Sequence, residues 1–252
     1  MITKETVLQQ LYSTSNDIAK EFDNSYKEEI NNIASELAIS YQILHDIINR
    51  EDQSQVSDAD FQSALLFWTA LNTYLAAVEL FRRGYNKEPQ MLIRNVLETF
   101  SAAFDIHVNP QKLPILRYRP KDFDSKKSIN IAKQIHPIIS QMWGMLSGFF
   151  SHVSIFHTVP HASKKASLCV GGLFESTEQK TIILGMLPPL QLALDIMNSV
   201  LELAFIKYIP NPRFWKQASD NTYIYKTPKE NMERGQKMIK KMEALLQNDQ
   251  QI

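Results

Sequence analysis

Apolar residues along most of this 252-residue chain recur at steps of three and four positions, and this spacing constrains the fold more than any other feature. In the stretch 25–49 the recurring set is Ile30, Ile33, Leu37, Tyr41, Leu44 and Ile48. Because an α-helix turns once every 3.6 residues, such a set lies on one face and predicts an amphipathic helix with one buried side. Only seven glycines are present, which disfavours a turn-rich β protein. We therefore expect an all-α fold.

The same spacing predicts a single helical domain, an up-and-down bundle of about seven helices that covers residues 1–252. The expected helices span about residues 5–22, 25–49, 57–83, 89–107, 128–157, 188–208 and 228–247. The N-terminal helices within 1–50 and the last helix, 228–247, are the elements that could lie at the periphery. Two short β-prone runs, Ser167–Leu173 and Lys180–Leu184, predict one small β-hairpin near 167–184.

Local signals mark both ends of the third predicted helix. Ser57 can cap its first turn, and Asp60 three residues later suggests a capping box. A stripe of large apolar residues follows: Phe61, Leu65, Trp68, Leu71, Leu75 and Val78. Gly84 predicts the end of the helix, because glycine readily takes the left-handed conformation found there. Pro89 then fits the first turn of the next helix.

The segment 108–127 contains three prolines and six basic residues, so no helix is expected to run through it. We expect a long basic loop. Its charge has two interpretations: a solvated surface loop, or a contact with RNA or another polyanion.

The composition excludes several classes of protein. Lys and Arg number 27, as do Asp and Glu, so no overall field steers the chain toward nucleic acid or an anionic membrane. The single Cys169 excludes an intramolecular disulfide and any multi-cysteine metal site. With a polar N-terminus that lacks a secretory signal, it predicts a cytoplasmic protein. Charges interrupt the apolar run Ile182–Ile209, so we expect a buried helix there and no membrane partner.

The fourth predicted helix carries the first candidate site. On a helical wheel, one narrow polar stripe runs between two apolar faces, and its members are Gln90, Arg94, Glu98, Ser101 and Asp105. Arg94 and Glu98 are four residues apart and can pair. Three interpretations remain open: a solvent-facing strip, a buried structural ion pair, or the wall of a cleft. In the cleft, Glu98 would position the Arg94 guanidinium for a carboxylate or phosphate.

A second candidate site lies in the fifth predicted helix. His152 falls on its apolar face, either as a hydrogen-bonded core residue or as an imidazole that faces Arg94. Gly144 and Gly148 lie in mid-helix, where each costs about 1 kcal/mol relative to alanine, so we expect a neighbouring helix or a ligand to approach closely. His157 and His161 are separated by a helix-breaking proline, with no carboxylate nearby, so no metal site is predicted.

A short pattern resembles one found in a bacterial family. GYNKEPQMLIRNVLETF, which begins at Gly84, is followed some fifty residues later by LSGFFSHVS. This pairing resembles bacterial all-helical proteins of unknown function that are similar in architecture to HEPN-like domains, over about residues 60–160. The resemblance implies metal-independent ribonucleases of toxin and defence systems, which place a histidine four to six residues after an arginine. Only Arg94 matches that motif, because no histidine follows it before His107.

These observations leave three functional hypotheses. The preferred one is a binding module without a cofactor, whose interhelical cleft, lined by Arg94, Glu98, His152 and Tyr85, holds a small anionic ligand or nucleotide. The second is an enzyme, a HEPN-type ribonuclease in which His152 transfers a proton and Arg94 stabilises phosphate charge. The third is a homodimeric interaction scaffold with no small-molecule site. The chain lacks a glycine-rich phosphate loop and the GxSxG, HExxH and CxxC motifs, which disfavours the enzyme.

Overall fold

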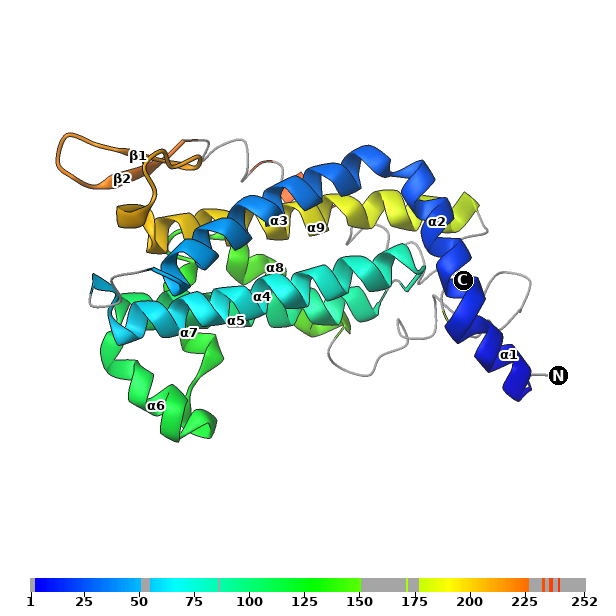
Figure 1. Cartoon of the computed structure of the whole chain (residues 1–252), viewed down its shortest axis with the longest axis horizontal. Helices are drawn as coiled ribbons and strands as arrows, with labels where there is room; N and C mark the ends of the chain where they lie inside the picture. Colours follow the sequence, from blue (N-terminus) through cyan, green and yellow to red (C-terminus); the bar gives the residue numbers. More distant parts are fainter. Residues whose placement is uncertain are drawn as a thin grey trace.

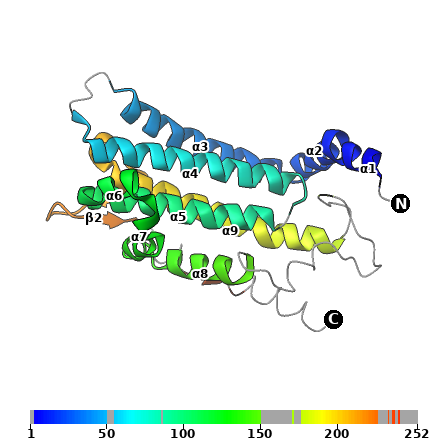
Figure 2. The same cartoon turned by 90° about the horizontal axis from the view of Figure 1, so that it is seen from below.

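A computed structural model describes residues 3–50, 55–85, 87–150, 171 and 177–226, with the isolated positions 233, 236, 237 and 240. Four long helices form the centre of the fold: α3 (Lys27–Ile48), α4 (Asp58–Arg82), α5 (Glu88–Val108) and α9 (Thr177–Ala204). They lie side by side along the long axis of the molecule (Figures 1 and 2). Helices α7 (Ser125–Ala132) and α8 (Ile138–Phe150) pack on α5. This order confirms a mostly helical fold.

Shorter elements extend from the two ends of the central helices. At one end are α1 (Lys4–Gln9), the π-helix η1 (Gln10–Thr14) and α2 (Ser15–Ser25), which together form an arm (Figure 1). At the other end are η3 (Pro110–Lys112), α6 (Leu113–Tyr118), η4 (Pro120–Asp122) and η7 (Ile206–Tyr208). As its prolines require, no single helix runs through the segment predicted as a basic loop. The segment forms the short helices η3, α6 and η4 in place of an extended loop.

The hairpin is present but lies in another segment. Strands β1 (Trp215–Gln217) and β2 (Tyr223–Tyr225) pair antiparallel, with Trp215 opposite Tyr225. The prediction of a hairpin near 167–184 is wrong for its second strand, because residues 180–184 belong to α9. Its first strand, 167–173, lies outside the described residues apart from Gly171. Asn221 turns the observed hairpin with a φ of 63°, a conformation that asparagine tolerates better than most residues.

Both predicted ends of α4 are confirmed in detail. The hydroxyl of Ser57 accepts a hydrogen bond from the backbone N–H of Asp60 at 3.0 Å. At the other end Gly84 has a φ of 80°, and Tyr85 N–H donates to Leu80 O at 3.1 Å. With the 3.0 Å bond from Gly84 N–H to Phe81 O, this is a Schellman motif, which satisfies two carbonyls at the helix end. The Asp60 side chain, in contrast, does not complete a capping box.

The face that α4 buries differs from the predicted stripe. The side chains that pack inward are mostly small residues and aromatic rings: Ser63, Ala64, Phe67, Ala70, Leu71, Tyr74, Ala77, Val78 and Phe81. Leu75, which the stripe placed in the core, is 49% exposed. Small side chains allow α5 to approach α4 closely, and Ser63 Oγ donates to the α5 carbonyl of Ala103 at 2.8 Å. Alanine and serine thus determine this interface.

Prolines act differently at two other sites. The predicted helix 128–157 is broken between α7 and α8, at His136-Pro137, because proline cannot donate the backbone hydrogen bond that a continuous helix needs. Helix α9 instead passes through Pro188-Pro189 and begins eleven residues before the predicted start. The predicted last helix, 228–247, lies largely outside the described residues.

One core of buried apolar side chains joins α2, α3, α4, α5, α7, α8 and α9. Within the described residues, α4 is the one helix long and apolar enough to cross a membrane by length and composition. Its Phe67, Leu71 and Tyr74 are fully buried in this core against neighbouring helices. Burial of Tyr74 raises the pKa of its hydroxyl, which donates to the α9 carbonyl of Leu190 at 2.9 Å.

Candidate functional site

Arg94 is held between α5 and α8 by three contacts. Its Nη2 lies 2.9 Å from Oε1 of Glu98, its Nε donates to Ser147 Oγ at 3.0 Å, and its guanidinium carbon lies 5.8 Å from the ring centroid of Trp143. Trp143 Nε1 also donates to Oε1 of Glu98 at 2.8 Å. The predicted pairing of Arg94 with Glu98 is therefore confirmed. We call these four residues the Arg94 cluster.

The polar stripe of α5 divides into two parts. The side chains of Arg94 and Glu98 are 32% and 21% exposed. Gln90, Ser101 and Asp105 are at most 1% exposed, so the stripe is not a solvent-facing strip. Polar groups that are buried this deeply need hydrogen-bond partners, and within the described residues only some of these side chains have them.

Among the described residues, two polar atoms of the stripe are buried without a hydrogen-bond partner: Nε2 of Gln90 and Oγ of Ser101. Gln90 lies one turn before Arg94, so the two side chains are neighbours on the helix surface. An unpaired buried polar group costs about 1–3 kcal/mol of stability. The Gln90 amide is thus an uncompensated donor beside a positioned guanidinium.

Gly144 and Gly148 lie on the exposed side of α8, next to Ser147. Apart from the chain neighbours and the backbone of α8 itself, no described atom lies within 4 Å of the place where a Cβ would stand on either glycine. The expectation that a neighbouring helix approaches them closely is therefore wrong for the described part of the chain. Among the described residues, the surface over these two glycines is open.

Among the described contacts, none brings the remaining predicted site residues into this cluster. Tyr85 is half-buried in the turn that joins α4 to α5, where its backbone closes the Schellman motif. His152 lies outside the described residues, as do His157 and His161, so its proposed approach to Arg94 stays a prediction. Within the described residues, no group of three or more His, Cys, Asp or Glu side chains is arranged to hold a metal ion.

Sequence reasoning missed a charged cluster at the other end of α5. The buried carboxylate of Asp60 lies 2.7 Å from Nδ1 of His107 and accepts from Lys207 Nζ at 3.0 Å. Burial acts to raise the pKa of Asp60, but Lys207 and His107 outweigh it and hold this pKa below its usual range. The three residues come from α4, α5 and η7, so no spacing along the chain could have joined them. The cluster ties these elements together.

A second missed cluster surrounds Asp105. Its carboxylate is 1% exposed and accepts from Lys112 Nζ at 2.7 and 2.8 Å, from Ser128 Oγ at 2.8 Å and from Asn109 Nδ2 at 2.8 Å. Asn109 and Lys112 lie at the start of the segment 108–127, and Ser128 directly follows its end. The cluster therefore anchors that segment to α5, a structural role.

A third charged group lies between α3 and α9. Arg213 Nη1 donates to Glu36, and its Nε lies 3.4 Å from Oε2 of the fully buried Glu202. Glu202 Oε1 accepts from the backbone N–H of Phe214 at 2.7 Å, which fixes the approach to β1. An open groove of about 320 Å³ beside it is lined by Asn32, Ile33, Glu36, Gln191, Leu194 and Asp195.

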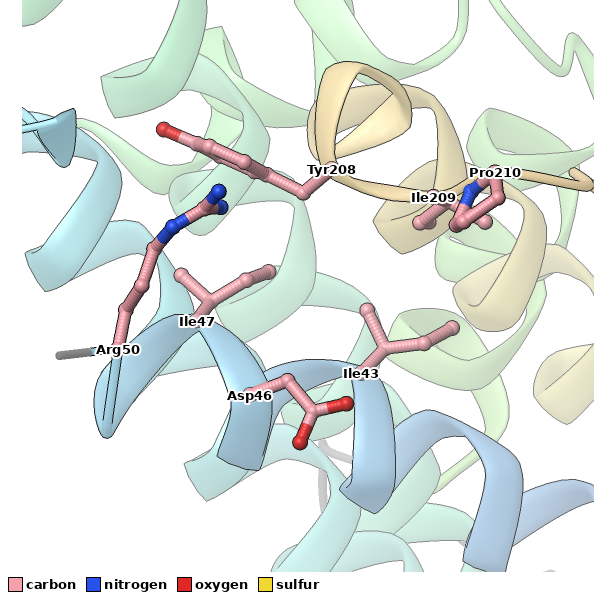
Figure 3. Close-up of a pocket in the computed structure, with 7 residues that line it drawn as sticks. All are labelled: Ile43, Asp46, Ile47, Arg50, Tyr208, Ile209 and Pro210. Atoms are coloured by element: carbon pink, nitrogen blue, oxygen red, sulfur yellow. The ribbon is translucent and has the colours of Figure 1, made fainter. Parts of the chain in front are cut away.

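A small pocket of about 130 Å³ opens at the end of α3 (Figure 3). Its walls are Ile43, Ile47, Ile209 and Pro210, with Asp46, Arg50 and Tyr208 as the polar residues. The guanidinium carbon of Arg50 lies 5.1 Å from the centroid of the Tyr208 ring. No spacing signal marks this pocket, because its two halves are about 160 residues apart in the chain.

Comparisons with known proteins add no relative to these observations. No protein-family model matches the chain. No curated protein and no solved structure matches it either. The resemblance to HEPN-like domains therefore stays a prediction, and the function has to be argued from the geometry above.

Proposed function

We propose that the protein is a binding module for a small anionic molecule, a carboxylate or a phosphate ester, held at Arg94. The single observation that carries this proposal is the buried amide nitrogen of Gln90, which lacks a partner in the described part of the chain and lies one turn from Arg94 on α5. A native fold rarely leaves a buried donor unpaired, and each exception requires an explanation. An acceptor oxygen on a bound anion supplies one here.

The Arg94 cluster supports the proposal because the guanidinium is positioned before any ligand arrives. Glu98, Ser147 and Trp143 fix its Nη2, its Nε and its flat face. Nη1 makes no hydrogen bond within the described structure and stays available. A side chain that is already ordered loses little entropy on binding, which favours affinity.

The charge of the cluster limits the class of ligand. Glu98 neutralises most of the charge of Arg94, so a weakly directional anion such as chloride gains little there. A carboxylate or phosphate gains more, because its oxygens match the fork of the guanidinium edge. In the part of the chain that the structure describes, the open surface over Gly144 and Gly148 leaves room for the rest of such a molecule.

Isothermal titration calorimetry with adenosine monophosphate, inorganic phosphate and succinate tests the proposal on the full chain. At least one probe should bind, and Arg94→Gln should weaken it about tenfold or more, as loss of a charged hydrogen bond of about 1.5–3 kcal/mol requires. Arg119→Gln, at a side chain that is 68% exposed, is the matched control and should leave the affinity unchanged. Equal affinity in wild type and Arg94→Gln, or no binding by the folded protein, would overturn the proposal.

The ribonuclease alternative requires His152 and therefore rests on no described contact. The homodimeric scaffold likewise has no specific observation in its favour. Both stay predictions.

A further inference from the structure

The pocket at the end of α3 combines opposite charges with an apolar wall, and it is distinct from the Arg94 cluster. Asp46 lies in the last turn of α3, and Arg50 lies two residues beyond the end of that helix at Ile48; both line the pocket. Within the described contacts, the Asp46 carboxylate accepts from Gln42 Nε2 at 2.7 Å and lies 3.5 Å from His45 Nδ1.

The segment after α9 closes the pocket and orients the arginine. Figure 3 shows Arg50 reaching toward the ring of Tyr208, while Ile43 and Ile47 point from α3 toward the segment Tyr208–Pro210. Tyr208 is itself held in place. Its hydroxyl donates to Gln55 O at 3.2 Å, and Lys207 Nζ lies 4.7 Å from its ring centroid. Arg50 therefore packs against a fixed aromatic surface.

The charges that line the pocket cancel, which decides the class of ligand. A simple anion would gain attraction from Arg50 and lose it again to Asp46, and a simple cation would meet the reverse. A molecule with both charges satisfies both walls at once.

The size of the pocket limits the ligand further. A cavity of about 150 Å³ is sufficient for benzene, which has six non-hydrogen atoms. The 130 Å³ available here is slightly smaller, so the pocket encloses a short aliphatic group while the charged ends of the molecule reach the mouth. The isoleucine side chains and Pro210 suit a short aliphatic group.

We propose that this pocket binds a small aliphatic α-amino acid as its zwitterion. Arg50 holds the carboxylate, Asp46 holds the ammonium group, and the side chain packs against Ile43, Ile47 and Ile209. Alanine, 2-aminobutyrate and valine fit this description, whereas phenylalanine is too large. The site requires no contribution from Arg94, so either proposal can fail without the other.

The test compares three probes on the full chain by calorimetry or ligand-observed NMR: valine, isovalerate, which lacks the ammonium group, and isobutylamine, which lacks the carboxylate. Wild type should bind valine about tenfold or more tightly than either analogue. Asp46→Asn should lower the affinity for valine and raise that for isovalerate. Arg50→Gln should lower the affinity for valine and raise that for isobutylamine. This reversal of preference is a result that a change in stability alone cannot produce.

Two exposed residues of the same types provide controls. Asp17→Asn and Arg119→Gln replace side chains that are 71% and 68% exposed, and both should bind valine as wild type does. Binding of isovalerate as tight as that of valine in wild type would overturn the proposal. So would an affinity for valine that does not change in Asp46→Asn or Arg50→Gln, or the absence of valine binding by the folded wild type.

Discussion

Arg94 and Trp143 come from different helices and contact the same carboxylate oxygen of Glu98. Arg94 Nη2 lies 2.9 Å and Trp143 Nε1 lies 2.8 Å from Oε1 of Glu98, while the guanidinium lies over the indole ring. Arg94 contacts Ser147, whereas Glu98, which comes later on α5, contacts Trp143, which comes earlier on α8. The two helices therefore run antiparallel, and this shared acceptor fixes their register as well as the direction of the guanidinium.

Replacing Trp143 by phenylalanine should separate the hydrogen bond of the indole from the packing of its ring against Arg94. The variant keeps a ring beside Arg94 but loses the indole N–H, so the unfolding free energy should fall by about 1 kcal/mol. Urea unfolding of Trp143→Phe, Glu98→Leu and the double variant measures it. The two single losses should add to more than the double loss, because both remove the same hydrogen bond. Strict additivity would show that the indole contributes only by packing.

Asp105→Asn should destabilise the fold more than any change in the Arg94 cluster. The buried carboxylate has four donor contacts, and the asparagine amide would face Lys112 and Ser128 with one acceptor in place of two. We expect the free energy of unfolding to fall by about 2–3 kcal/mol. This is less than for a fully buried ion pair, because Lys112 is 30% exposed and water can hydrate its ammonium group. The free energy of unfolding in urea measures it. Lys112→Met should cost less, since the other donors of Asp105 remain, and the opposite ranking would contradict this account.

The stability of the fold should decrease in mild acid because of His136. This imidazole is 8% exposed and lies 2.6 Å from Ser199 Oγ, and burial lowers its pKa from 6.5 to about 4. Between these values the unfolded chain binds a proton that the folded one does not, so protonation favours unfolding. Stability should therefore fall by up to about 3 kcal/mol as the pH drops from 6.5 to 4.

Urea unfolding at several pH values checks this prediction against a variant. His136→Gln keeps a group that can hydrogen bond to Ser199 but cannot titrate, so its unfolding free energy should change less over the same interval. Identical slopes in wild type and variant would assign the acid sensitivity to other groups.

Two glycine-to-alanine changes should shift stability in opposite directions. Gly84 has a φ of 80°, so Gly84→Ala forces a left-handed alanine and should cost about 1–2 kcal/mol. Gly144 lies on an exposed helix face with space for a methyl group, so Gly144→Ala should stabilise by up to about 1 kcal/mol. Thermal unfolding of both variants provides the comparison. A loss of stability in Gly144→Ala would show that another part of the protein contacts the helix face at Gly144.

The sequence predicted local features well because they depend on neighbours in the chain. The cap at Ser57, the helix end at Gly84 and the pairing of Arg94 with Glu98 all involve residues at most five positions apart. The buried face of α4 could not be found in this way. The predicted stripe counted large apolar residues, whereas close approach to α5 selects small ones such as Ser63 and Ala70.

The remaining site features depend on distant segments. Asp60 meets His107 and Lys207, and Arg50 meets Tyr208, because of how the helix ends converge, which no periodicity in the chain encodes. The hairpin at Trp215–Tyr225 had a local signal, the Asp220-Asn221 turn between aromatic residues, that the prediction did not use. The β-prone composition of residues 180–184 was overridden by the long helix α9.

The most direct test of the anion site at Arg94 is a titration of Gln90→Leu with adenosine monophosphate and inorganic phosphate, alongside its unfolding in urea. Leucine removes the buried unpaired amide at similar volume, so stability should rise by about 1–2 kcal/mol, while affinity for the anion should fall about tenfold. Gln9→Leu, at an exposed position, is the control and should change both the stability and the affinity for the anion less than Gln90→Leu does. If Gln90→Leu binds the anion as tightly as wild type, the buried amide does not serve a ligand and the central claim is wrong.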